Sequence, residues 1–136
     1  VIDTQRDVFG NRGLELGPRP EGAPHEAWAA HAAAVRSAVT DEETLLATYD
    51  SFFGPTTLAD TLLSFYRFDL IIHAWDIQQA AGNDLELSDT ELAFLETCIP
   101  SWGDAFYQDG ICKRPVEVPD DADRQTRVLA LTGRRC

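Results

Sequence analysis

One stretch of the sequence, residues 57–81, contains neither glycine nor proline and lies between Gly54-Pro55 and Gly82-Asn83. A threonine at its start can cap a helix, and a glycine followed by an asparagine favours a left-handed stop at its end. We therefore predict one uninterrupted helix of about 25 residues, close to 40 Å long. It would be the longest element of the chain and would determine how the other elements pack.

The remaining patterns also predict helices. Residues 1–9 have the apolar spacing of a helix tail without a capping residue, and the alanine-rich run 24–39 begins with a proline at its first turn. Residues 10–23 predict a long irregular connection. We predict a second mostly irregular stretch at 41–57, with extended structure near 49–53. The expected fold is all-α, with long loops.

Two more helices are predicted towards the C-terminus. Ser88 and Glu91 form a capping box for a helix that Pro100 should bend or split. A short extended connection leads to a last helix near 122–132, which Gly133 should end.

Composition limits the class of protein. A chain of 136 residues with 44% hydrophobic content suits a single domain, residues 1–136. Its net charge of −12 disfavours binding to nucleic acid or to anionic membrane surfaces. No apolar run approaches the roughly 20 residues of a membrane span. Three cysteines without CxxC spacing favour free thiols in a reducing cytoplasm: Cys98, Cys112 and Cys136.

The long helix carries polar residues at positions where a core-forming helix is usually apolar. Asp69, His73 and Asp76 are spaced i, i+4 and i+7, so at 100° per residue they lie on one face. An imidazole and a carboxylate one turn apart can reach one metal ion. The same spacing also suits a hydrogen-bonded structural pair, and spacing alone favours that simpler interpretation.

Other candidate groups have less support. Within the predicted helix 24–39, neither His25 nor His31 has an acid or cysteine one turn away, so we expect surface or edge positions for both. A cysteine protease would need a local sequence pattern around its thiol, and none is present. Asp76 could accept a hydrogen bond from an imidazole, cap a neighbouring segment or pair with an arginine. We expect Asp69 and His73 to face an interior cleft, on the side of Phe65 and Ile77.

Residues 69–82, DLIIHAWDIQQAAG, resemble the N-terminal domain family of mycothiol-dependent maleylpyruvate isomerases, within the DinB-like superfamily of metal-binding four-helix bundles. The pattern is an acid, three residues, a His-Ala-Trp-Asp-Ile run, and an alanine-rich approach to a glycine. Weaker similarity includes FGPTTLADTLL and VEVPDDADRQTRVLALTGRR, so the resemblance covers most of residues 25–135 and is closest to actinobacterial members.

This resemblance implies a DinB-like up-and-down four-helix bundle that holds a divalent metal, zinc or nickel. Asp69 and His73 match two of the ligands. The third, a histidine of the first helix, has no match and would lie before Val1, so most of the first helix is expected to be missing from this chain. The apolar face that this helix would cover would then be buried by the rest of a longer polypeptide or by a second copy in a homodimer.

The same resemblance implies a function. A metal-activated thiol, mycothiol or another low-molecular-weight thiol, would act as a nucleophile in an isomerase or transferase whose partner substrate is a small electrophile. Asp76 would support the metal ligands from the second coordination shell. The alternatives are a non-catalytic metal-binding or sensor module and a purely structural bundle without metal.

Overall fold

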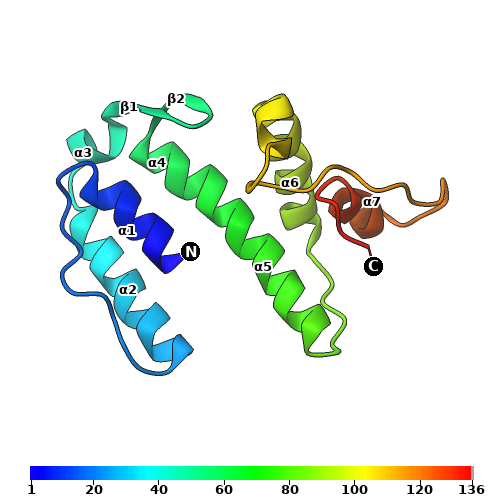
Figure 1. Ribbon diagram of the computed structural model, residues 1–136, viewed down its shortest axis with the longest axis horizontal. Coiled ribbons are helices and arrows are strands. Elements are labelled where there is room, and N and C mark those ends of the chain that lie inside the picture. The colour runs from blue at the N-terminus through cyan, green and yellow to red at the C-terminus, as the bar shows by residue number, and fades with distance from the viewer. Residues whose placement is uncertain (136) are drawn as a thin grey trace. The chain divides into compact units, whose positions relative to one another are not determined.

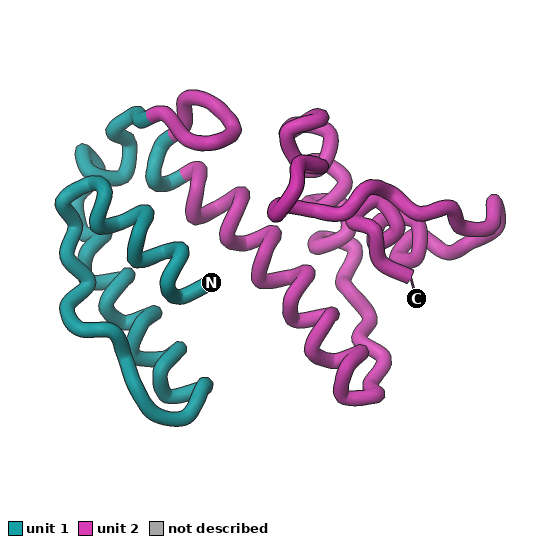
Figure 2. Tube along the Cα trace, viewed as in Figure 1, with its two compact units in different colours: residues 1–49, 57–59 teal, residues 50–56, 60–136 magenta. Residues whose placement is uncertain are grey.

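The computed structural model describes residues 1–135 and is mostly helical, with one two-stranded sheet (Figure 1). The prediction of a largely helical fold is confirmed. Cys136, predicted to be a free thiol, lies outside the described residues. The chain folds as two compact units, residues 1–49 with 57–59 and residues 50–56 with 60–136 (Figure 2).

The first unit contains α1 (Ile2–Gly10), α2 (Pro24–Ala38) and the short helix α3 (Glu42–Leu46). Phe9 and Leu58 are fully buried there. The helix α3 lies in a region predicted to be mostly irregular. Its N-cap is Asp41, whose carboxylate accepts a hydrogen bond from the Thr44 N–H at 2.6 Å.

A β-hairpin follows α3. Strands β1 (Thr48–Ser51) and β2 (Gly54–Thr57) pair with each other, so the extended structure predicted near 49–53 is present in β1. At the turn, the Ser51 hydroxyl donates to the Gly54 carbonyl at 2.7 Å. The Phe53 N–H donates to the same hydroxyl oxygen at 3.1 Å.

The predicted long helix is present from Leu58 to Ala80, but it is not uniform. It consists of α4 (Leu58–Asp60), a π-helical segment η1 (Thr61–Tyr66) and α5 (Arg67–Ala80), which follow one another directly (Figure 1). The C-terminal stop is as predicted, because Gly82 has φ +77°. The Gly82 N–H bonds the Gln79 carbonyl and the Asn83 N–H bonds the Gln78 carbonyl, as in a Schellman motif.

The second unit also contains α6 (Asp89–Trp102), the 3₁₀ helix η2 (Gly103–Tyr107) and α7 (Arg124–Ala130). The predicted capping box is confirmed, since Ser88 and Glu91 exchange backbone and side-chain hydrogen bonds. Of the two outcomes predicted at Pro100, a bend or a split, the split is not found at Pro100 itself. Pro100 lies in the last turn of a single helix, and the break comes at Gly103, which has φ +54°.

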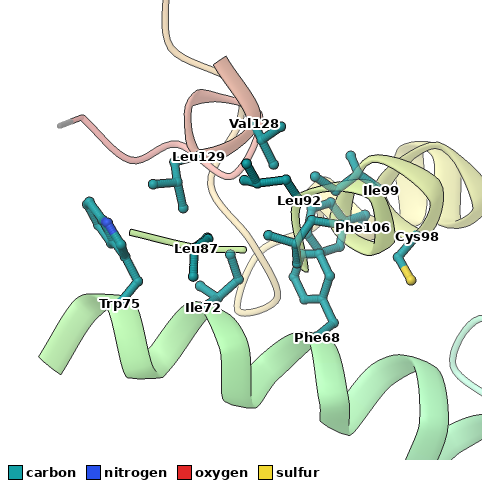
Figure 3. Packing of buried hydrophobic residues seen from close by; sticks show 11 residues of the cluster. Phe68, Ile72, Trp75, Leu87, Leu92, Cys98, Ile99, Phe106, Val128 and Leu129 are labelled. Atoms are coloured by element: carbon teal, nitrogen blue, oxygen red, sulfur yellow. The ribbon is translucent and has the colours of Figure 1, made fainter. Parts of the chain in front are cut away.

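The core of the second unit explains why α5 is held in place. Its buried face carries Phe68, Ile72 and Trp75, which point towards apolar side chains of α6, η2 and α7 (Figure 3). Their i, i+4, i+7 spacing repeats that of the polar residues, one position earlier. Burying each side chain contributes about 1.5–3 kcal/mol. The polar triplet therefore lies on the neighbouring face of a firmly packed helix.

Candidate metal centre

His73 contacts both Asp69 and Asp76 on α5, as their spacing predicts. His73 Nε2 lies 3.2 Å from Asp69 Oδ1, and His73 Nδ1 lies 3.2 Å from Asp76 Oδ2. The Asp76 contact has hydrogen-bond geometry. The imidazole therefore lies between two carboxylates, one on the preceding turn and one on the following turn.

The exposure of this site differs from the prediction. The His73 side chain is 49% exposed and the Asp69 side chain 29% exposed, so His73 does not face a closed interior. Phe65 is half-buried and Ile77 is exposed, so the side of the helix that they were predicted to share with Asp69 and His73 is not uniformly buried. Phe65 and Ile77 are twelve residues apart, which at 100° per residue places them about 120° apart around the helix axis. The π-helical segment η1, which contains Phe65, changes this angle further.

Asp76 is held by an arginine from the far end of the chain. Arg134 Nε donates to Asp76 Oδ1 and Arg134 Nη2 donates to Asp76 Oδ2, both at 2.7 Å. Such bidentate, charge-assisted pairs are among the stronger hydrogen bonds of proteins. These bonds hold the pKa of the Asp76 carboxyl below its ordinary value of 3.8, although partial burial opposes the shift. Of the alternatives for Asp76, both the imidazole contact and the arginine pair are present.

A C-terminal motif of α7 directs Arg134 towards α5. The Gly133 N–H bonds the Ala130 carbonyl at 3.0 Å and the Arg134 N–H bonds the Leu129 carbonyl at 3.3 Å, the pattern of a Schellman motif. Gly133 has φ +75°, and an added Cβ would lie 2.5 Å from the Lys113 Cβ. Both the backbone conformation and the available space therefore require glycine at this position.

The donor atoms fit a shared divalent cation at one pair of positions. Two ligands that bind one zinc ion at ~2.0–2.2 Å with tetrahedral geometry lie about 3.3–3.5 Å apart. His73 Nε2 and Asp69 Oδ1, at 3.2 Å, are close to that separation. Among residues 1–135, no group of three or more histidine, cysteine, aspartate and glutamate side chains is arranged to hold a metal ion. The described residues thus offer a ligand pair.

Among the described residues, no cysteine is grouped with Asp69 and His73 as a metal ligand. Cys98 and Cys112 are free, as predicted, and burial raises the pKa of both thiols above the ordinary value. The Cys112 thiol donates to the Thr132 carbonyl at 3.5 Å, and Arg134 Nη1 donates to the same oxygen at 3.2 Å.

His25 is exposed, as predicted, but the prediction for His31 is wrong. His31 is fully buried, and its Nε2 lies 2.7 Å from Gln5 Oε1 of α1. Its Nδ1 has no hydrogen-bond partner among the described residues. Burial, together with the positive charge of Arg6, lowers the pKa of His31 below its ordinary value of 6.5.

Sequence reasoning missed two residues of consequence. His31 follows the buried Ala27 by one turn, but in an alanine-rich helix the inward face has little apolar contrast. Arg134 lies 58 positions from its partner Asp76, and no local spacing identifies such a pair. The one available indication was the Gly133-Arg134 sequence, since a glycine at a helix end can redirect the next residue.

No family model, curated protein or solved structure matches the chain. None of the helices within residues 1–135 is long and apolar enough to span a membrane.

Proposed function

We propose that this chain is a divalent-metal-binding helical protein of DinB-like type, in which Asp69 and His73 supply two ligands to a zinc or nickel ion. One observation carries the proposal: Nε2 of His73 and Oδ1 of Asp69 lie 3.2 Å apart on adjacent turns of α5. The hydrogen bond between His73 Nδ1 and Asp76 supports it, because metal-binding histidines usually donate their other ring nitrogen to a carboxylate.

The proposed activity is that of a thiol-dependent isomerase or transferase. A bound divalent cation would lower the pKa of a coordinated thiol, mycothiol or a similar small thiol. In the isomerase reaction the thiolate would add to the β-carbon of an enoyl acid and give an enolate. The Cα–Cβ single bond would then rotate, and breaking of the C–S bond would re-form the double bond and release the thiolate. The residues of this chain would hold the site open to a small molecule, since the His73 side chain is half exposed.

A structural role is the competing proposal, and the Arg134 pair favours it. An imidazole between two carboxylates, one of which also binds an arginine, makes a complete network without metal. A metal-binding module without catalysis is the second competitor. A measurement of metal binding separates the structural role from the enzyme and the metal-binding module. A measurement of turnover then separates the enzyme from the module.

The test begins with zinc and nickel titrations of the purified chain and three variants. Asp69→Asn and His73→Ala remove one ligand each, whereas His25→Ala removes an exposed histidine outside the site. We expect the wild type and His25→Ala to bind one ion per chain with equal affinity, and the two site variants to bind at least tenfold more weakly. Equal binding by wild type and His73→Ala would refute the ligand assignment.

The second step adds a panel of thiols and cis-enoyl acids to the metal-loaded chain. Turnover that needs both metal and thiol, and that His73→Ala abolishes, supports the enzyme. Metal binding without turnover across the panel favours the non-catalytic module.

A further inference from the structure

We infer that Arg134 is a positioning residue that, through Asp76, orients the imidazole of His73 and keeps its Nε2 unprotonated, so that this nitrogen can bind a metal ion. The inference rests on the proposed metal site. It adds a residue from the C-terminal end of the chain, 58 positions from Asp76, to a site otherwise made by one helix.

Two hydrogen bonds from Arg134 fix the orientation of the Asp76 carboxylate. Arg134 donates to both oxygens of Asp76 at 2.7 Å, so the plane of the carboxylate is fixed. Oδ2 receives both the Arg134 Nη2 bond and the His73 Nδ1 contact at 3.2 Å. Without the guanidinium, Asp76 would be free to rotate towards water, because its side chain is 35% exposed.

The two ring nitrogens of His73 face different carboxylates. The hydrogen bond that one nitrogen makes decides which of the two carries the proton in a neutral imidazole. Only carboxylate oxygens face His73 in these contacts, and an ionised carboxylate accepts hydrogen bonds without donating them. The contact to Asp76 has hydrogen-bond geometry, so the proton belongs on Nδ1. The lone pair of Nε2 then faces Asp69 Oδ1, the arrangement that a shared cation stabilises.

The fold also constrains Arg134 itself. The Schellman motif at the end of α7 reverses the chain at Gly133, where any larger residue would meet Lys113. Arg134 Nη1 also donates to the Thr132 carbonyl at 3.2 Å, which anchors the guanidinium on its own segment. The neighbouring Arg135 is exposed and offers a matched control.

The test measures the tautomer of His73 in the metal-free protein by ¹⁵N NMR of its ring nitrogens. The His73 resonances are identified by their loss in His73→Ala, and pH is raised until the shifts stop changing. We expect the wild type and Arg135→Gln to carry the proton on Nδ1, and Arg134→Gln to shift towards the Nε2–H form. Arg134→Lys keeps the charge but not the bidentate fork, so it should recover the wild-type tautomer only in part.

Zinc affinity is the second readout. Arg134→Gln and Asp76→Asn should each weaken binding about tenfold, and the double variant should be no weaker than the weaker single variant, because both act through one chain of contacts. Arg135→Gln should bind like the wild type. Additive losses in the double variant would contradict the inference.

The zinc and tautomer measurements test the proposed metal site and the role of Arg134 separately. A wild type that binds no zinc overturns the proposed function, whereas the tautomer measurement still decides the role of Arg134. A wild-type His73 protonated on Nε2, or a tautomer unchanged in both Arg134 variants, overturns the inference even where zinc binds. Dispersed amide spectra of the variants establish that each one is folded.

Discussion

His31 in α2 and His73 in α5 are both helix residues whose Nε2 lies near a side-chain oxygen, but their surroundings differ in burial and charge. His31 is fully buried against the neutral amide of Gln5. His73 is half exposed between the carboxylates of Asp69 and Asp76. A buried neutral partner makes the first histidine part of the packing between α1 and α2. Two partly exposed carboxylates make the second a candidate cation ligand.

This difference shows that spacing and burial answer separate questions. The i, i+4 spacing of Asp69 and His73 was sufficient to predict which side chains meet. It did not predict how exposed they would be. For His31, the lack of an acid at ligand spacing argued against a metal role, but it carried no information about burial.

The largest expected effect comes from His73→Ala. It should weaken zinc binding by about two orders of magnitude, since one of two protein ligands is lost. The free energy of unfolding should change by only about 0.5 kcal/mol or less, because the side chain is half exposed and the buried face of α5 is intact. Zinc titration and urea unfolding of the same samples measure both quantities. A large loss of stability would instead favour the structural role.

The second effect comes from His31→Ala, for which the opposite pattern is expected. Removing a fully buried imidazole leaves a cavity and an unpaired, buried Gln5 amide, at a cost of about 2–4 kcal/mol in the free energy of unfolding. Zinc affinity should not change. His25→Ala, at an exposed position of the same helix, is the control and should be neutral in both measurements. Similar stability losses for His25→Ala and His31→Ala would remove the distinction in burial.

A smaller effect is expected from pH. The pKa of His31 is lowered on folding, so the unfolded chain binds the proton more readily and acid favours unfolding. The contribution of His31 to the free energy of unfolding is complete above its ordinary pKa of about 6.5. It decreases as pH falls from there through the lower pKa of the folded state. Urea unfolding of the wild type and of His31→Gln, compared from pH 8 to pH 5, measures it. The wild type should lose stability relative to the variant, and parallel curves would contradict the expectation.

Asp76 should respond at lower pH. Its pKa is also lowered on folding, mainly by Arg134, so its contribution is present above the ordinary value of 3.8 and is lost as pH falls further. The difference in the free energy of unfolding between the wild type and Asp76→Asn, measured by urea unfolding, should therefore decrease as pH falls below 3.8. A difference that stays constant as pH falls below 3.8 would mean that the Asp76–Arg134 pair does not govern the titration.

Much of the helical framework follows from local sequence. Gly82 ends α5, and the capping box of Ser88 and Glu91 begins α6, because both depend on backbone groups within a few residues. The π-helical segment η1 was not predicted, and no glycine or proline within it marks the change. Helix α3 had a local indication in the Asp41 cap, but five residues are too few for a clear apolar period.

The candidate site was predictable only in the part that lies on one helix. Asp69, His73 and Asp76 follow from a single period, whereas Arg134 reaches Asp76 through the packing of α7 on the core of the second unit. Such pairs depend on tertiary structure. Local patterns identify the residues that can pair but not which of the arginines will do so.

The central claim, that Asp69 and His73 bind a divalent cation, is tested most directly by X-ray absorption spectroscopy of the chain loaded with one equivalent of zinc or nickel and no added thiol. The account predicts one imidazole ligand and otherwise oxygen or nitrogen donors, with the imidazole lost in His73→Ala and retained in His31→Ala. Sulfur scattering from a cysteine, or an imidazole signal that persists in His73→Ala, would place the metal elsewhere and contradict the account.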